Sequence, residues 1–353
     1  MRDESKHRIR RRRVLLALAG VLVAWLVVDK ALAVIAPEPT VGHWRSQEGF
    51  EAYRAAYDDV MATLPEPARA HDVATEYGTV RVYEWAATET GERAGETEEE
   101  RTDAEEETAS GERLPVVLLP GIRSGAPMWG ENLLHWIGDR TLYAMDAIGD
   151  AGMSVQSVPF TSFDDQAAWV EQVLSGLELE RAHVVGHSFG AAVAATHTLH
   201  HPGRVASLTL LEPVMVLRGL PASVYLWSSL LLLPAPQSWK DRALAEIGGV
   251  TVEEVRERTP MSVMIDEGSQ HYAALAPTPR TLSDEEWGSI SVPVRVDIAD
   301  DHSLAGGEEA AKRARDLGKG PVTVWPGTSH SLPMQAAEEL GPELEAYWTE
   351  HDR

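Results

Sequence analysis

The sequence predicts an α/β fold with a mostly parallel, eight-stranded sheet, helices on both faces, a helical cap inserted after the sixth strand, and an N-terminal membrane helix. Three features of the chain predict it. From about residue 72 onward, short apolar runs alternate with amphipathic helical stretches. One of those runs stops at a serine flanked by glycines, where a helix of small residues begins. Near the N-terminus, a basic cluster precedes an uncharged apolar run.

The composition excludes several classes of protein. The chain has 353 residues and a formal net charge of −24, and so acidic a surface repels phosphates, so we expect no nucleic-acid partner. The absence of cysteine excludes disulfides, a thiolate nucleophile and a cysteine metal site. Hydrophobic residues make up 44% of the chain, enough for one large domain with an inserted cap or for two ordinary domains.

The chain up to residue 36 is predicted to target a membrane. Residues 1–13 are rich in arginine and are expected in the cytoplasm, and residues 14–36 are predicted to form a transmembrane signal anchor. The uncharged run 14–28 spans only ~22 Å as a helix, short of a ~30 Å hydrocarbon core. The span must therefore extend to about residue 36, with Asp29 and Lys30 near its outer end.

A cleavable signal peptide is the alternative, with its small-residue cleavage site at 31–33. In both cases the positive-inside rule places residues 40–353 outside the cytoplasm. The protein is therefore expected to be membrane-anchored with its main domain extracytoplasmic, or secreted after cleavage.

Residues 37–71 are predicted to form an amphipathic linker helix, because aromatic and apolar residues recur there at helical spacing. This helix is expected to pack on the main domain or on the membrane surface. The runs 73–77 and 79–85 flank Gly78, as the strands of a hairpin do. Residues 87–114 hold two runs of three glutamates and almost no apolar residues, so we expect a disordered, solvated acidic insert.

Residues 115–119 form a continuous apolar run, typical of a strand buried on both faces of a parallel sheet. A turn follows at 120–125. The next elements are expected in this order: a helix over 127–137 with Trp129, Leu133, Leu134 and Ile137 on its apolar face, a strand over 141–145, a structural loop rich in Asp and Gly over 146–154, and a helix over 163–177.

The serine turn lies at 186–190, with the sequence G-H-S-F-G. Glycines two residues before and after Ser188 allow a tight turn between the strand at 183–185 and the following helix, so that the hydroxyl stands exposed as a nucleophile. A glycine-bounded turn whose serine only caps the helix is the structural alternative. The strand before the turn and the helix after it favour the nucleophile elbow.

Beyond this turn, the alternation of strands and helices is interrupted once. A strand over 205–211 ends at Glu212, and residues from about 214 to 291 are predicted to form a helical cap with helices over 224–233, 239–247 and 252–257. The remaining elements are expected in this order: a strand over 294–299, a helix over 306–316, a strand over 322–325, a loop with His330, and a closing helix over about 335–348.

Three motifs, in this order, give the chain a resemblance to a known family: L-L-P-G-I at 118–122, G-H-S-F-G at 186–190 and G-T-S-H at 327–330. From about residue 72 to residue 350, the chain resembles the α/β-hydrolase family, and its serine esterases and lipases in particular. The resemblance implies that Ser188 is the nucleophile and His330 the general base. It also implies an oxyanion hole formed by the N–H groups of Ile122 and Phe189, and no metal or organic cofactor.

The third member of the triad is predicted to be Glu212. The family most often places this acid in a loop resembling G-x-x-D, but the matching stretch at 299–302 reads A-D-D-H, with histidine where the acid is expected. Glu212 closes the preceding strand, a position that carries the acid in a minority of the family. Pro213 ends that strand at the carboxyl edge of the sheet. Asp301 is the alternative acid.

These features predict a membrane-tethered serine hydrolase that cleaves a carboxylic ester or related acyl bond through an acyl-enzyme. Tyr225, Trp227 and the leucines at 230–233 concentrate apolar surface in the cap, so a small hydrophobic substrate is expected. A haloperoxidase-like or carbon–carbon bond hydrolase on the same triad is one alternative. A non-catalytic, membrane-bound scaffold is the other, and the sequence leaves the oligomeric state open.

Overall fold

The computed structural model describes residues 40–88, 113–220, 236–248, 251–274 and 276–353, together with Val224 and Trp227. The predicted basic segment 1–13, the predicted membrane anchor 14–36 and most of the predicted acidic insert therefore lie outside the described residues. So do Tyr225 and the apolar run 230–233 of the cap. Within the described ranges, no helix is both long enough and apolar enough to cross a bilayer.

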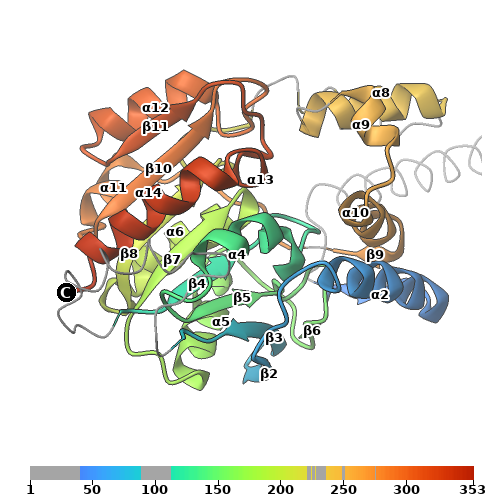
Figure 1. Ribbon diagram of the computed structural model, residues 1–353, viewed down its shortest axis with the longest axis horizontal. Helices are drawn as coiled ribbons and strands as arrows, with labels where there is room; N and C mark the ends of the chain where they lie inside the picture. Colours follow the sequence, from blue (N-terminus) through green and yellow to red (C-terminus); the bar gives the residue numbers. More distant parts are fainter. Residues whose placement is uncertain are drawn as a thin grey trace, which may run out of the picture. The chain divides into compact units, whose positions relative to one another are not determined.

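A single large sheet organises residues 41–353 (Figure 1), which form one compact unit. Its strands run in the order β11-β10-β8-β7-β4-β5-β3-β2, and all pairings from β5 to β11 are parallel. The strands are β2 (Arg69–Thr75), β3 (Gly78–Trp85), β4 (Val116–Leu119), β5 (Leu142–Met145), β6 (Val155–Gln156), β7 (Ala182–His187), β8 (Val205–Leu211), β10 (Val294–Ala299) and β11 (Val322–Trp325).

The expectation of eight strands is too low by one. The eight predicted strands form the continuous path, but the two-residue strand β6 also pairs, antiparallel, with the first residues of β3. So short a strand leaves no period of its own in the sequence. A further pair of strands lies outside the sheet and joins β1 (His43–Trp44) to β9 (Tyr272–Ala273). These strands are also only two residues long, so the sequence did not predict them.

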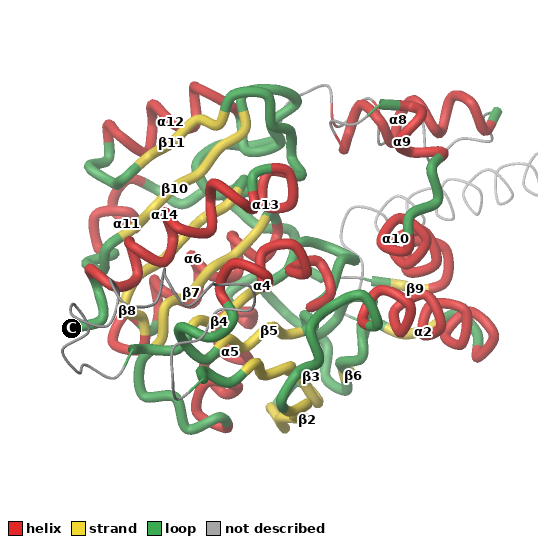
Figure 2. Tube along the Cα trace, viewed as in Figure 1, coloured by secondary structure: helices red, strands yellow, loops and turns green. Residues whose placement is uncertain are grey.

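Helices cover both faces of the sheet (Figure 2). Their bounds are α2 (Gln47–Met61), η1 (Ala126–Trp129), α4 (Gly130–Trp136), α5 (Asp165–Gly176), α6 (Phe189–His200), η2 (Pro202–Arg204), α8 (Gln237–Gly248), α9 (Val252–Arg256), α10 (Pro260–His271), α11 (Asp284–Ser289), α12 (Gly307–Asp316), α13 (Leu332–Gln335) and α14 (Ala337–Glu350).

Successive residues of the central strands enter two different apolar cores. Val117 and Leu119 of β4 pack with α5, α6, α11 and α12, whereas Val116 and Leu118 pack with α2, α4, α10 and α14. Side chains alternate across a strand, so a strand covered on both faces must be apolar at every position. This explains the uninterrupted apolar run by which the sequence predicts β4.

The linker helix is shorter than the predicted range 37–71. Helix α2 begins after Ser46, whose hydroxyl accepts a hydrogen bond from Gly49 N–H at 3.0 Å, and it ends at Met61. Pro65 and Pro67 follow, and proline cannot continue a helix, so the chain turns and enters β2 at Arg69. The apolar face of α2 packs on the domain.

The cap region contains α8, α9 and α10, and α10 was not predicted. Its start signal is present, since Thr259 caps the helix and Pro260 is its first residue. The predicted helix 224–233 lies almost entirely outside the described residues. Upstream of the cap, the predicted helix 127–137 is split into η1 and α4. Leu134, expected on its buried face, is instead 56% exposed, because α4 is only two turns long and buries a narrow stripe.

The two flanks of the segment 89–112 attach to the same turn. On the upstream side, Thr88 N–H donates to the carbonyl of Gly138 at 3.1 Å. On the downstream side, Arg113 contacts Asp139 at 3.3 Å, and Arg140 donates to the carbonyl of Leu114 at 2.8 Å. The turn at 138–140 therefore fixes where the chain leaves β3 and where it returns to β4.

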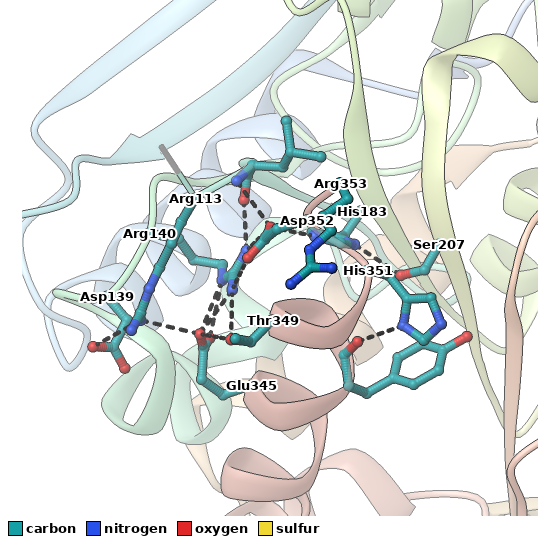
Figure 3. Close-up of polar contacts among 12 residues, drawn as sticks. Arg113, Asp139, Arg140, His183, Ser207, Glu345, Thr349, His351, Asp352 and Arg353 are labelled. Atoms are coloured by element: carbon teal, nitrogen blue, oxygen red, sulfur yellow. Dashed lines mark hydrogen bonds and ion pairs between the residues drawn. The ribbon is translucent and has the colours of Figure 1, made fainter. Parts of the chain in front are cut away.

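A buried polar cluster fastens the end of the chain to the amino-terminal ends of the central strands (Figure 3). Arg140 is fully buried and donates to Glu345 at 2.8 Å and to Asp352 at 2.9 Å. Asp352 also contacts Nε2 of His183 at 2.9 Å, while Nδ1 of His183 contacts the Ser207 hydroxyl at 2.8 Å. The Arg140 charge and the acceptors around it satisfy one another, as buried charges require.

Candidate active site

Ser188 stands on a strained turn between β7 and α6. Its φ of 56° and ψ of −118° are unfavourable for a residue with a side chain. Both flanking glycines are required by contact, because a Cβ at 186 would lie 2.4 Å from the carbonyl oxygen of Gly190, and a Cβ at 190 would lie 2.3 Å from that of Leu119. The structure thus has the elbow geometry that the motif predicts.

His330 lies between Ser188 and Glu212. Its Nε2 is 2.8 Å from Ser188 Oγ, and its Nδ1 is 3.1 Å from Glu212 Oε2. A carboxylate only accepts hydrogen bonds, so Nδ1 carries the proton and Nε2 is free to accept one from the serine hydroxyl. This is the tautomer that a general base needs.

The Glu212 carboxylate is fully buried and held by several donors besides His330. Oε1 accepts from Ala299 N–H at 2.8 Å and from the Ser303 hydroxyl at 2.7 Å, and Oε2 accepts from Leu304 N–H at 3.1 Å. Glu212 itself has a φ of 48°, so the backbone turns at the end of β8 and directs the side chain along the edge of the sheet. These contacts fix the orientation of the carboxylate toward His330.

Asp301, the alternative acid, has a different environment. Its carboxylate is 71% exposed and contacts Nδ1 of His302 at 2.8 Å. The loop that carries Asp301 supplies donors to Glu212 rather than the acid itself. The structure therefore brings Ser188, His330 and Glu212 together and leaves Asp301 at the surface.

The two expected oxyanion residues come from two different elements. Phe189 is the first residue of α6, and Ile122 lies in the turn after β4, with its side chain 52% exposed. Within the described part of the chain, neither N–H group has a hydrogen-bond partner. Gly121 packs close to Ser188, because a Cβ there would lie 3.3 Å from Ser188 Cβ. Both N–H groups are thus available to a ligand beside the nucleophile.

Two carboxylates, the fully buried Asp146 and the partly buried Asp150, hold the turn that carries Ile122. Asp146 accepts from Ala126 N–H at 2.7 Å, and Asp150 accepts from Arg123 N–H. Burial raises the pKa of Asp150 to about 6, although its hydrogen bonds from Arg123 and Ala151 oppose the rise. The sequence predicted a structural role for the loop 146–154, but no local pattern indicated that this loop contacts the turn of Ile122.

His187, the residue before the nucleophile, was not singled out from the sequence. Its Nε2 lies 2.9 Å from the carbonyl oxygen of His330, and the two imidazole rings lie 4.9 Å apart. Burial, together with the neighbouring His330, lowers the pKa of His187 to about 3. His187 therefore stays neutral and supports the loop of His330 without adding a competing charge.

In the described ranges, no three histidine or acidic side chains gather where they could hold a metal ion. The arrangement at the carboxyl edge of the sheet consists of a hydroxyl on a strained elbow, a correctly oriented imidazole, a buried carboxylate and two unpartnered N–H groups. Serine hydrolases use this arrangement to transfer acyl groups.

Comparison with known proteins also indicates a hydrolase. A model of the alpha/beta hydrolase family matches residues 116–342. Carboxylesterase YbfK of Bacillus subtilis (strain 168) is 24% identical over 302 residues, which cover 83% of this chain and 91% of YbfK. The chain therefore belongs to the alpha/beta hydrolase family.

Solved structures show the same fold. The crystal structure of naproxen esterase (carboxylesterase NP) from Bacillus subtilis superimposes with a TM-score of 0.71 at 19% identity, covering 86% of this chain and 99% of that one. The crystal structure of carboxylesterase CesB (YbfK) from Bacillus subtilis gives a TM-score of 0.69 at 21% identity, covering 85% and 98%. This protein is thus carboxylesterase-like in sequence and in fold.

Proposed function

We propose that the protein is a membrane-tethered serine hydrolase that cleaves a carboxylic ester, or a related acyl bond, of a hydrophobic substrate through an acyl-enzyme. The observation that carries this proposal is the hydrogen-bonded chain from Ser188 through His330 to Glu212, with distances of 2.8 Å and 3.1 Å. The carboxylesterase names of its relatives support an ester as the substrate.

In the acylation step, His330 Nε2 takes the proton of Ser188 as Oγ attacks the carbonyl carbon. The negative charge that develops on the carbonyl oxygen is stabilised by the N–H groups of Ile122 and Phe189. The imidazolium then gives its proton to the leaving alkoxide, the ester C–O bond breaks, and an alcohol departs. Water repeats the sequence with His330 as base, which releases the carboxylic acid and restores Ser188.

The hydrophobic substrate is proposed from the cap. Trp239 of α8 is 59% exposed in the described part of the cap, and the sequence places further apolar residues in the same region. A cap with an apolar surface favours a substrate whose acyl or aryl part leaves water on binding. Measuring the turnover of esters of increasing chain length tests this part of the proposal.

The nucleophile is tested with a fluorophosphonate probe and the Ser188→Ala variant. We expect the wild-type protein to be labelled at Ser188, and we expect Ser188→Ala to lose labelling and at least about 10³-fold in turnover. Ser207→Ala is the matched control, since Ser207 also contacts a histidine at 2.8 Å but is completely buried. A folded wild-type protein that is neither labelled nor active would contradict the proposal and favour a scaffold.

The membrane tether is proposed from the basic cluster and the apolar run that follows it. We expect the full chain to partition with membranes, with its catalytic domain extracytoplasmic, and a protein lacking residues 1–36 to be soluble and active. N-terminal sequencing of the mature protein provides the check. A mature chain beginning at Val34 would show signal-peptide cleavage, and hence a secreted enzyme.

A further inference from the structure

Helix α2 reaches the turn at 120–126, which carries Ile122 and is called the oxyanion turn below, although the helix precedes the family-matched region, which begins at residue 116. The contact is made by Tyr57, which is 1% exposed. Its hydroxyl donates to the Asp146 carboxylate and lies 3.0 Å from Oδ2 and 3.2 Å from Oδ1. A hydrogen bond from a buried hydroxyl to a buried carboxylate is among the stronger contacts that a neutral side chain makes.

Asp146 joins this helix to the turn of Ile122. The carboxylate is completely buried at the end of β5 and also accepts from Ala126 N–H and Met153 N–H, both at 2.7 Å. The fit is close, because a Cβ at position 125 would lie 2.8 Å from Asp146 Oδ1. A shift of this carboxylate would therefore move the backbone at residues 125 and 126.

Two carboxylates hold the turn just after the N–H group of Ile122. Asp146 holds Ala126, Asp150 holds Arg123, and the N–H of Ile122 precedes both without a partner of its own. An oxyanion donor must lie within about 2.7–3.1 Å of the developing charge. The position of the Ile122 N–H therefore depends on the contacts that fix the rest of the turn.

We propose that Tyr57 is a positioning residue that holds the oxyanion turn through Asp146, so that helix α2 is part of the catalytic unit. The kinetic consequence of this inference rests on the proposed function above. Tyr57 acts on the transition state only, because the oxyanion does not exist in the bound substrate. Its loss should lower kcat without raising KM.

Tyr53 supplies a matched control on the same helix. It is as deeply buried as Tyr57, at 0% exposed, and among the described residues its hydroxyl has no hydrogen-bond partner. Both substitutions to phenylalanine remove one buried hydroxyl and keep the ring. Only Tyr57→Phe removes a contact with Asp146.

The experiment compares Tyr57→Phe and Tyr53→Phe in the full chain. The first readout, hydrogen exchange of the peptide covering residues 120–130, needs no turnover. In Tyr57→Phe, we expect the amides of Arg123 and Ala126 to exchange several-fold faster than in the wild type. In Tyr53→Phe, we expect their exchange rates to be unchanged. Unchanged exchange in Tyr57→Phe, or equal acceleration in both variants, would overturn the inference.

The second readout is steady-state kinetics on an activated ester. We expect Tyr57→Phe to lower kcat about tenfold with KM unchanged, less than the ~10²–10³-fold cost of removing an oxyanion donor itself. A kcat that does not change, or a loss of the same size in Tyr53→Phe, would also overturn the inference. A wild-type protein without turnover would refute the proposed function, whereas the exchange data would still decide the structural claim.

Discussion

Strands β7 and β8 carry two sets of serine, histidine and carboxylate, one at each end. At their carboxyl ends, Ser188 follows β7 and Glu212 follows β8, and both contact His330. At their amino ends, His183 of β7 faces Ser207 of β8, and Asp352 completes the set. The same residue types thus meet twice on one pair of strands.

The distances do not separate the two sets. The histidine lies 2.8 Å from each serine hydroxyl, and 3.1 Å and 2.9 Å from the two carboxylates. The two histidines use opposite ring nitrogens. In His330, Nδ1 faces the carboxylate and Nε2 the hydroxyl, whereas in His183, Nε2 faces the carboxylate and Nδ1 the hydroxyl. Each histidine is held as one tautomer, with its proton directed to the acid.

Backbone geometry and exposure do separate them. Ser207 lies within strand β8 and is completely buried, so no substrate can reach its hydroxyl. Ser188 lies on a strained turn, and among the described residues the N–H groups of Ile122 and Phe189 have no hydrogen-bond partner. Asp352 also contacts Arg140, which ties it into a buried ionic cluster. Hydrogen bonding among a serine, a histidine and a carboxylate therefore occurs in both sets. The strained turn and the unpartnered N–H groups distinguish the set that we propose to be catalytic.

The largest effect is expected at the acid. Glu212→Gln keeps the size of the side chain but allows the wrong tautomer of His330, so we expect kcat to fall by about 10⁴. Asp301→Asn is the control, with kcat expected within about threefold of wild type, because Asp301 faces solvent. Kinetics on one ester substrate compares the two variants, and a large loss confined to Asp301→Asn would reassign the acid.

The corresponding change in the second set should affect stability and not turnover. Asp352→Asn removes the charged acceptor of two buried groups, Arg140 and His183, so we expect the free energy of unfolding to fall by about 3 kcal/mol. Urea denaturation measures the loss. Glu350→Gln, at an exposed position on α14, is the control and should change stability by less than about 0.5 kcal/mol. A large drop in kcat for Asp352→Asn at unchanged stability would contradict the distinction between the sets.

The smallest effect concerns pH. Burial lowers the pKa of His183, although its hydrogen bond to Asp352 opposes the change. The folded protein therefore binds less proton at His183 than the unfolded chain does as the pH falls through about 6.5, the ordinary pKa of histidine. Because the unfolded state then binds more protons, stability falls as pH falls, by up to about 1.4 kcal/mol per pH unit for this group.

His183→Gln should remove that increment from the slope of unfolding free energy between about pH 6 and pH 5. His187 and His197, whose pKa values are also lowered by burial, keep their own contributions in the variant. Urea titrations at several pH values measure the slope. An identical slope in wild type and variant would show that His183 is protonated in the folded protein.

Strand prediction succeeded for β8, β10 and β11. The runs 205–211, 294–299 and 322–325 match these strands, because their apolar residues recur at every second position. Helix limits were less accurate. Periodicity alone extended α2 through Pro65 and Pro67, and α10 has too weak an apolar stripe to be recognised from its period.

Some residues of the candidate site could be predicted from the sequence, and others could not. Ser188 and His330 lie in local motifs, and Glu212 could be predicted because it follows the last residue of β8. The roles of Tyr57 and Asp146 could not be predicted, since 89 positions separate the two partners and neither has a local signature. The contact between His183 and Asp352 spans 169 positions. Such contacts depend on how the elements pack, which the local pattern does not encode.

The turn at 138–140, which receives both flanks of the segment 89–112, has a practical consequence. Thr88 and Leu114 both form hydrogen bonds with this turn. The two residues that flank the segment are therefore held close together by the rest of the domain. The entropy of closing a loop depends only weakly on its length, so a short glycine–serine bridge or an inserted reporter domain could replace those residues at little thermodynamic cost. The protein thus offers a natural insertion point on the side of the sheet remote from its chemistry.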